Sequence, residues 1–419
     1  MTDRRIEAIS RVAVIAYHSS PLAEPGAGDS GGMSVYVREL ASALAARGVE
    51  TDIFTRAHDV TDAPVAIGPG VRVVPIAAGP LDAVKDALPS FVDEFARGVV
   101  SFASSERRTY DVVHSHYWQS GIVGRRLSVR WRVPLVHSSH TLGKVKNRYL
   151  APGDTPEPLH RLVGESEVIS AADVMVASTE EERDELIGLY GTPIQRIKTI
   201  YPGVDHDLFG PEGPSARAEL GVGDAAVLLY VGRIQPLKGI ELAIRATSLI
   251  GSESGREAHL VVVGGASGAR GEAEVARLQA LTSELGLDRR VTFLGPRRRT
   301  ELPQLYRAAD AVVVCSHSES FGFAALEAHA CGVPVVGTAV GGLSHVVRDG
   351  ASGFLVDTRD PIEFAARLNT LLGDDDLQKS FAVQAKASAA RFDWGHTADA
   401  VLDLYECLAR VDEPEACTC

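Results

Sequence analysis

The sequence is poor in cysteine, in long apolar runs and in positive charge. Five cysteines among 419 residues are too few for the disulfide framework of small secreted domains. No apolar run approaches the roughly 18 residues of a membrane-spanning helix. Because 42 Lys and Arg face 55 Asp and Glu, the net charge is −13, and no overall field favours nucleic acid. We therefore expect a cytoplasmic protein that binds neither membranes nor nucleic acid.

The apolar residues gather in short runs that lack the polar alternation of half-buried strands. Strands with both faces buried have this pattern, because helices cover both faces of a parallel sheet. The chain also exceeds the size of about 250–300 residues at which single cores stop growing. The pattern therefore predicts two doubly wound α/β domains.

The order of the runs predicts where each domain lies. The expected strands are 11–17, 49–55, 71–76, 111–115, 134–138 and 173–177 in the first half, and 225–232, 259–264, 291–295, 311–316, 334–337 and 353–356 in the second. Two glycines and two prolines between 209 and 215 interrupt the pattern, so we predict the boundary near 207–217. The expected domains are 1–206 and 207–393, followed by a C-terminal helix and tail at 394–419.

A glycine cluster at 26–32 precedes the first expected helix, at 33–47. It contains the pattern G-x-G-x-x-G, and Asp52 follows at a distance suited to a ribose contact, so a dehydrogenase is one interpretation. In dinucleotide sites the glycines follow the first strand directly, whereas residues 18–25 intervene here. A loop before a helix still offers N–H groups to an anion. A phosphate-binding loop is therefore favoured over a dinucleotide site or a plain flexible loop.

Two further constellations follow strand ends in the second half. Arg233 and Lys238 share a short strand–helix loop, and a guanidinium beside an ammonium suits a diphosphate. Glu319 and Glu327 flank Phe321-Gly322-Phe323, which would open a helix with free N–H groups. Glu327 would accept hydrogen bonds from a ribose diol, with Glu319 at the mouth of the site. If no ligand binds here, Arg233 and Lys238 are surface cations beside a turn. The glutamate pair is then an exposed carboxylate and a charge at a helix N-terminus.

With these motifs the chain resembles the retaining GT-B glycosyltransferases that share the E-x7-E pair. Landmarks along nearly the whole chain carry the resemblance: Gly28-Asp-Ser-Gly-Gly-Met33, His114-Ser-His-Tyr-Trp118, Asp154-Thr-Pro-Glu-Pro158 and Phe392-Asp-Trp394. They are most similar to those of the D-inositol 3-phosphate glycosyltransferases of mycothiol biosynthesis. The resemblance implies two Rossmann-like domains that face a cleft, a C-terminal helix that crosses back to the first domain, and a homodimer. It also implies GlcNAc transfer from UDP-GlcNAc to 1D-myo-inositol 3-phosphate.

The resemblance also assigns roles to individual residues. On the donor side it implies that Arg233 and Lys238 hold the diphosphate, that Glu327 holds the ribose and that Glu319 orients the sugar. Further donor contacts are implied for Gly32 and for Arg297, which lies beside the base. The helix start at Gly322 and Phe323 would add N–H groups for the donor phosphate. The implied acceptor contacts are His18, Asp29, Ser34, Lys85, Tyr117, Thr141 and Arg161, the last four around the phosphate. His140 is placed beside the reacting sugar, and the catalytic set is His140, Arg233, Lys238 and Glu319.

The resemblance implies no cofactor for catalysis. It allows a peripheral Mg²⁺ held largely by main-chain oxygens near Tyr306, Arg307 and Ala309, although Val333 replaces the threonine expected to complete that site. The implied mechanism is attack on the face that the leaving group departs from, with the leaving phosphate taking the acceptor proton. The protein would act by orienting both substrates and stabilising the departing diphosphate.

Two departures from the family pattern leave the acceptor open. Ser34 stands where an asparagine that touches the cyclitol is expected. The segment from His140 to Lys146 resembles sucrose-phosphate synthases, which use fructose 6-phosphate. Transfer to fructose 6-phosphate or to an aminocyclitol is therefore kept as an alternative. A dehydrogenase would not explain the glutamate pair, and a non-catalytic binding protein would not need paired cations at a cleft.

Overall fold

The structure is a computed structural model that describes residues 8–23, 26, 30–59, 61–251, 256–268 and 270–410. The strands are β1 (Arg11–Ile15), β2 (Glu50–Arg56), β3 (Val65–Gly68), β4 (Val71–Ile76), β5 (Val112–His116), β6 (Leu135–Ser138), β7 (Val174–Ala177), β8 (Ile197–Thr199), β9 (Ala226–Val231), β10 (Ala258–Val263), β11 (Val291–Gly295), β12 (Ala311–Val314), β13 (Val335–Thr338) and β14 (Gly353–Val356). The α-helices are α1 (Gly32–Ala45), α2 (Val92–Ser105), α3 (Trp118–Trp131), α4 (Gly143–Arg148), α5 (Leu159–Ala171), α6 (Glu180–Tyr190), α7 (Arg217–Leu220), α8 (Ile240–Ser248), α9 (Gly271–Glu284), α10 (Leu302–Tyr306), α11 (Phe323–Ala330), α12 (Leu343–Val346), α13 (Pro361–Leu372), α14 (Asp375–Ala389) and α15 (Trp394–Arg410). The 3-10 helices are η1 (Lys85–Phe91), η2 (Ile194–Arg196), η3 (Pro236–Lys238) and η4 (Arg299–Glu301).

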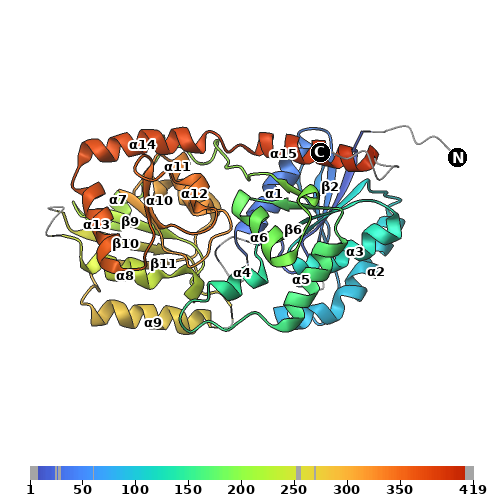
Figure 1. The fold of residues 1–419 in the computed structure, drawn as a ribbon, viewed down its shortest axis with the longest axis horizontal. Coiled ribbons are helices and arrows are strands. Elements are labelled where there is room, and N and C mark those ends of the chain that lie inside the picture. The colour runs from blue at the N-terminus through green and yellow to red at the C-terminus, as the bar shows by residue number, and fades with distance from the viewer. Residues whose placement is uncertain are drawn as a thin grey trace.

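Two α/β units lie side by side, and each is built around one sheet (Figure 1). The sheet of the first unit has the strand order β3-β4-β2-β1-β5-β6-β7-β8. The sheet of the second unit has the order β11-β10-β9-β12-β13-β14. The strand pairs within both sheets are parallel, apart from the antiparallel pair β3–β4. The prediction of two doubly wound units is confirmed.

Both faces of each sheet are buried under hydrophobic side chains. Along β9, Leu228 and Tyr230 enter one hydrophobic cluster, whereas Val227 and Leu229 enter the other. The division follows from the strand period of two residues, which points successive side chains to opposite faces. Since helices cover both faces, the strand sequences do not alternate between apolar and polar residues.

The predicted strands are all present, with ends that differ by at most two residues. Two further strands, β3 and β8, are not indicated by the sequence pattern. Strand β3 is antiparallel and lies at the edge of the first sheet, where Val65 is 43% exposed. Strand β8 forms the opposite edge and is only three residues long. Strand β3, Val-Ala-Ile-Gly, is apolar but largely exposed, and strand β8, Ile-Lys-Thr, has no apolar run.

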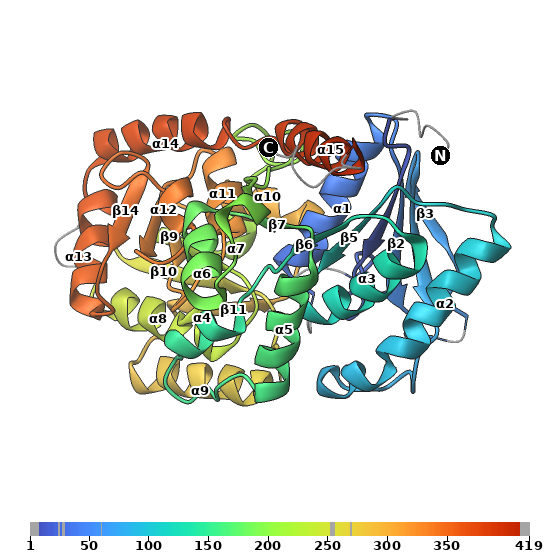
Figure 2. The ribbon, with the colours of Figure 1, turned by 45° about the vertical axis from the view of Figure 1, so that its right-hand side comes forward.

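The chain passes between the two units at two neighbouring points. Val204, after the first sheet, and Asp393, before α15, form an isolated parallel bridge. Helix α14 covers the second unit, while α15 lies over the first unit and packs on α1 (Figures 1 and 2). The Tyr405 hydroxyl on α15 lies 2.6 Å from Nδ1 of His114 on β5. Among the described residues, no helix combines the length and the apolarity needed to cross a membrane.

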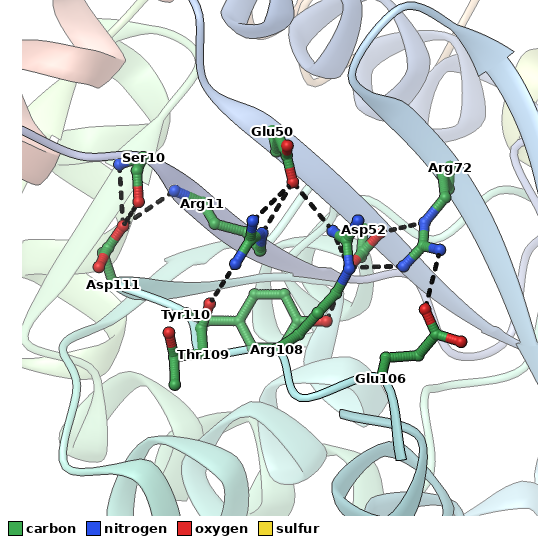
Figure 3. Close-up of polar contacts among 10 residues, drawn as sticks. All are labelled: Ser10, Arg11, Glu50, Asp52, Arg72, Glu106, Arg108, Thr109, Tyr110 and Asp111. Atoms are coloured by element: carbon green, nitrogen blue, oxygen red, sulfur yellow. Dashed lines mark hydrogen bonds and ion pairs between the residues drawn. The ribbon is translucent and has the colours of Figure 1, made fainter. Parts of the chain in front are cut away.

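A charge network lies near the amino ends of β1, β2 and β4 (Figure 3). The Asp52 side chain, 1% exposed, accepts hydrogen bonds from Arg72 at 2.8 Å, Arg108 at 3.0 Å and the Tyr110 hydroxyl at 2.7 Å. Arg108 also donates to Glu50 at 3.1 Å. Asp52 is therefore a structural carboxylate enclosed by its partners, and not the ribose ligand that a dehydrogenase would require.

Candidate active site

Two adjoining cavities lie at the carboxyl ends of the strands. The large cavity, about 360 Å³, is lined by loops that follow β1, β5, β6 and β7 in the first unit and β9, β12 and β13 in the second. The small cavity, about 170 Å³, lies among the loops that follow β9, β10, β11 and β12. The residues that line both are Gly31, Gly32, Arg233, Lys238, Glu319, Gly322 and Phe323. Doubly wound sheets bind their ligands at the carboxyl ends of their strands.

The residues that the sequence predicts for the donor all line the small cavity. They are Gly32, Arg233, Lys238, Arg297, Glu319, Gly322, Phe323 and Glu327. The Lys238 ammonium lies 2.6 Å from Oε2 of Glu319, and the Ser316 hydroxyl donates to the same oxygen at 3.0 Å. Arg233 contacts Ser267 at 3.3 Å. Two cations from one loop thus meet a carboxylate where the small and large cavities join.

Backbone geometry fixes the loop that carries Lys238. Gly239 follows Lys238 with φ +62°, and a Cβ there would lie 2.2 Å from the carbonyl oxygen of Cys315. Gly341 has φ +48°, and a Cβ there would lie 2.0 Å from the carbonyl oxygen of Glu319. A side chain at Gly239 would push the Lys238 loop away from Cys315, and one at Gly341 would push the loop after β13 away from Glu319, so glycine is required at both.

Glu327 is a buried carboxyl at one wall of the small cavity. It lies on α11, which begins after Gly322, a residue with φ +100°. The Tyr306 hydroxyl donates to Glu327 Oε2 at 2.8 Å. Burial raises the pKa of Glu327 to about 7, although the charge of Arg299 acts in the opposite direction. The carboxyl is thus positioned to accept hydrogen bonds from a hydroxyl-bearing ligand in the cavity.

The first unit closes over the small cavity with Gly31 and Gly32. A Cβ at Gly31 would lie 3.2 Å from Nε of Arg233, and one at Gly32 would lie 3.0 Å from the Phe323 ring. Helix α1 begins at Gly32 without a side-chain cap, so N–H groups of its first turn are available to an anion. Asp29, the other residue predicted in this loop, lies outside the described residues.

Four residues predicted to hold an acceptor phosphate gather around one ring. Lys85, Tyr117 and Thr141 line the large cavity, and the Lys85 ammonium lies 4.8 Å from the Tyr117 ring centroid. The Arg161 guanidinium lies 5.2 Å from the same ring and donates to Thr141 Oγ1 at 3.1 Å. Arg161 is 4% exposed and pairs with Glu157 at 2.7 Å, so it stands behind Thr141 rather than in the cavity wall.

His140 and His18 line the large cavity as uncharged imidazoles. Burial lowers the pKa of His140 to about 3, and its Nε2 lies 2.9 Å from His116 Nδ1. Burial and the neighbouring cations, Lys85 first, hold the pKa of His18 well below its usual value. His140 has φ +58° and Tyr117 has φ +75°, values that non-glycine residues rarely adopt outside functional sites.

Ser34 and the predicted metal residues do not line either cavity. Ser34 is buried on α1, with its hydroxyl 2.9 Å from that of Ser19. The Tyr306 carbonyl accepts from the Ala309 amide, and Arg307 donates to main-chain carbonyls of the neighbouring loop. Among the residues that the structure describes, no group of three or more His, Cys, Asp or Glu is arranged to hold a metal. Because the Tyr306 carbonyl already accepts a hydrogen bond, this segment fits Mg²⁺ poorly.

The two units meet through contacts beside the cavities. The Ser320 hydroxyl donates to the His140 carbonyl at 2.6 Å, and the Gly265 amide donates to the Gly26 carbonyl at 2.8 Å. Arg299 of the second unit pairs with Glu39 of the first at 2.7 Å. These contacts hold the loops of both units around one site.

Family models match both units of the chain. The model described as glycosyl transferase 4-like domain matches residues 31–203, and the model described as glycosyl transferases group 1 matches residues 214–388. D-inositol 3-phosphate glycosyltransferase of Xylanimonas cellulosilytica is 46% identical, with 94% of this chain and 96% of the relative covered. The Kineococcus radiotolerans protein of the same name is 48% identical, with 96% of each covered. This chain belongs to the D-inositol 3-phosphate glycosyltransferase family.

A solved structure agrees with the fold of this D-inositol 3-phosphate glycosyltransferase family member. Sucrose-phosphate synthase from Thermosynechococcus elongatus is 31% identical, and the match covers 94% of this chain and 98% of that one with a TM-score of 0.87. The GT-B architecture predicted by resemblance is therefore confirmed, and the chain is a glycosyltransferase.

Some contacts of the family member's site are indicated by no motif. Arg299 lines the small cavity, yet its partner Glu39 is 260 residues away in sequence. The sequence names Tyr306 only for a metal site built largely of main-chain oxygens, and nothing in it indicates that the Tyr306 hydroxyl binds Glu327. Ser320 lies inside the E-x7-E motif, but its bond to His140 depends on the approach of the two units. The sequence indicates which segments form the site, but it does not indicate which residues of different segments contact each other.

Proposed function

We propose that the protein transfers GlcNAc from UDP-GlcNAc to 1D-myo-inositol 3-phosphate with retention of configuration. The observation that carries the proposal is the junction of the two cavities at Arg233, Lys238 and Glu319, with the predicted donor ligands on one side and the predicted phosphate ligands on the other. Relatives that match nearly the whole chain bear the name of this activity.

The small cavity supplies what a departing nucleoside diphosphate needs. Arg233 offers a fork of N–H donors and Lys238 a compact charge, and both lie beside the shared opening. When the donor binds, its diphosphate replaces Glu319 as a partner of Lys238. Glu319 is then free to accept hydrogen bonds from hydroxyls of the sugar. The cations stabilise the charge that develops on the diphosphate as its bond to the sugar breaks.

The large cavity orients the acceptor. Lys85, the Thr141 hydroxyl and the Tyr117 hydroxyl bind its phosphate, while Arg161 adds positive charge and holds Thr141 in place. An acceptor hydroxyl then attacks the anomeric carbon on the face from which the diphosphate leaves. Its proton passes to the departing phosphate oxygen, so that the new glycosidic bond forms as the sugar–phosphate bond breaks. His140, with its pKa near 3, donates or accepts a hydrogen bond but is not the base.

A matrix of donors and acceptors tests this proposal. UDP-GlcNAc, UDP-glucose and GDP-sugars are each incubated with inositol 3-phosphate, fructose 6-phosphate and an aminocyclitol, and nucleoside diphosphate release is followed. We expect release with UDP-GlcNAc and inositol 3-phosphate, and an α-linked product by NMR. The proposal is contradicted if no acceptor increases the release of nucleoside diphosphate, or if the product is β-linked.

Transfer to fructose 6-phosphate is the second candidate. Its support is the likeness to sucrose-phosphate synthase and the placement of Lys146 in the wall of the large cavity. Lys144, the other lysine of that segment, instead donates to the Leu189 carbonyl at 2.7 Å and lies over Tyr190. Preference for fructose 6-phosphate over inositol 3-phosphate in the same matrix would favour this candidate.

We also propose that the protein is a cytoplasmic homodimer that needs no metal for catalysis. The resemblance implies the homodimer and the catalysis without a cofactor. Light scattering on the purified protein tests the dimer, and a monomer at micromolar concentration contradicts it. Assays with and without a chelator test the metal, and we expect equal rates.

A further inference from the structure

Lys85, the predicted cation for the acceptor phosphate, lies on an exposed segment of the first unit. It opens η1, and its neighbours Val84, 70% exposed, and Asp86 are both at the surface. The Lys85 ammonium nevertheless lies 4.8 Å from the Tyr117 ring centroid, and the Arg161 guanidinium lies 5.2 Å from the same centroid. Because like charges repel and a lysine side chain has many rotamers, the surrounding structure must hold Lys85 in this place.

A buried arginine holds the segment that leads into η1. Arg56, the last residue of β2, is 2% exposed. Its Nη1 donates to the Pro80 carbonyl at 2.9 Å, and its Nη2 donates to the Leu81 carbonyl at 3.0 Å. The same two nitrogens lie 3.5 Å from the carbonyl oxygens of Ala78 and Ala83. One guanidinium thus binds the main chain of this segment repeatedly and fixes where η1 begins.

A buried glutamine joins η1 to the helix that follows Tyr117. Gln119, 2% exposed, lies in the first turn of α3, and its Nε2 donates to the main-chain carbonyl of Lys85 at 3.0 Å. Its Oε1 is buried and has no hydrogen-bond partner among the described residues. Burial of an unpaired amide oxygen lowers folding stability, so stability alone does not explain a glutamine here. The bond instead ties together the two segments that carry Lys85 and Tyr117.

Tyr17 connects the same region to the end of β1. Its hydroxyl donates to the Leu88 carbonyl in η1 at 2.9 Å, and its main-chain amide donates to Ser120 Oγ on α3 at 3.0 Å. Tyr17 is fully buried and directly precedes His18. Buried hydrogen bonds therefore join the segments after β1, β4 and β5, and all three segments line the large cavity.

We propose that Arg56 and Gln119 are positioning residues that hold the Lys85 ammonium against the Tyr117 ring, ready for the acceptor phosphate. The inference deepens the proposed function and rests on it. Neither Arg56 nor Gln119 lines the large cavity, so both act through Lys85. The two bonds fix the main chain, and the ring holds the ammonium by a cation–π contact. A cation already in place loses less conformational freedom when the phosphate binds, so the acceptor binds more tightly.

Gln119→Leu is the variant that tests this inference most cleanly. It keeps most of the side-chain volume and removes both the bond to Lys85 and the unpaired Oε1, so folding stability should change little. The fraction of protein with Lys85 in place should fall, and the apparent affinity for the acceptor falls with that fraction. We expect KM for 1D-myo-inositol 3-phosphate to rise about fivefold, as for the loss of one typical hydrogen bond, and KM for UDP-GlcNAc to stay unchanged. Arg56→Met breaks more bonds and should raise the acceptor KM more than about tenfold.

Coupling to Lys85 separates positioning from a general structural effect. In the Lys85→Met background, Gln119→Leu should have no further effect on the acceptor KM, because the group that it positions is gone. A general loosening of the large cavity would weaken acceptor binding in either background. Gln378→Leu is the matched control, because Nε2 of Gln378 on α14 donates to the Asp310 carbonyl at 2.9 Å, and neither residue lines either cavity.

Initial rates of UDP release, with each substrate varied in turn, give these values, and urea unfolding shows that each variant is folded. A rise in the acceptor KM of Gln119→Leu that disappears in the Lys85→Met background supports the inference. An unchanged acceptor KM in Gln119→Leu or in Lys85→Met, or an equal rise in both backgrounds, overturns it. If Arg56→Met does not fold, Gln119→Leu decides alone. If the unaltered protein releases no UDP with this acceptor, the proposed function is overturned together with the inference.

Discussion

Substitution of Lys238 by methionine removes the ammonium at the junction of the two cavities and keeps most of the side-chain volume. In the free protein Lys238 pairs with Glu319 at 2.6 Å, and the two side chains are 21% and 16% exposed. After the substitution Glu319 keeps the hydroxyl of Ser316 and partial contact with solvent. The loss of folding stability should therefore be small, about 1 kcal/mol.

The loss of turnover should be far larger than the loss of stability. A unit charge about 4 Å from the departing diphosphate contributes about 4 kcal/mol at the screening typical of partly exposed sites. Removal of a single donor aimed at developing charge typically lowers kcat by about 10²–10³. We expect a fall of this size for Lys238→Met, because the charge on the diphosphate grows as the sugar leaves.

Single-turnover release of the nucleoside diphosphate, at saturating donor and acceptor, measures the effect on the chemical step. Lys379→Met is the matched control, since Lys379 is 76% exposed on α14 and pairs only weakly with Asp376. Glu319→Gln combined with Lys238→Met should lose less than the sum of the single losses, because the two groups are in contact. A Lys238→Met rate within threefold of the unaltered rate would refute the assignment of the leaving-group charge to this residue.

Three further substitutions probe other parts of the structure. Asp52→Asn should cost about 3 kcal/mol in urea unfolding, because it breaks a buried ion pair, yet leave kcat of the folded protein unchanged; an unaltered unfolding midpoint contradicts the structural role. Gly341→Ala should lower kcat at least about tenfold and destabilise by more than about 1 kcal/mol, because its Cβ would lie 2.0 Å from the Glu319 carbonyl; normal kinetics would show that this contact relaxes freely. Lys85→Met should raise KM for the phosphorylated acceptor about tenfold or more and leave KM for the donor unchanged, and a rise in the donor KM instead would move Lys85 to the other substrate.

Most of the fold can be predicted from the sequence, because most of its strands are buried on both faces. Continuous apolar runs such as β9 and β13 admit few other interpretations once helices alternate with them. The edge strands β3 and β8 are short and partly exposed, so the pattern expected of strands with both faces buried does not indicate them.

The two halves of the site differ in how far the sequence reveals them. Most donor residues follow strand ends in the second unit, where the spacing along the chain marks the Arg233–Lys238 loop and the Glu319–Glu327 motif. The neighbouring positions of β9 and β12 in the sheet then bring Lys238 and Glu319 together. Lys85 and Thr141 come from separate loops of the first unit, so only a family resemblance could group them. The Arg299–Glu39 pair depends on how the two units meet, and no local pattern encodes that approach.

A structure of the protein with UDP and 1D-myo-inositol 3-phosphate tests the central claim most directly. The account predicts the diphosphate against Arg233 and Lys238, the ribose against Glu327, and the acceptor phosphate against Lys85 and Thr141. A nucleotide bound outside the small cavity, or an acceptor phosphate in contact with Arg233 and Lys238 instead, would contradict the account.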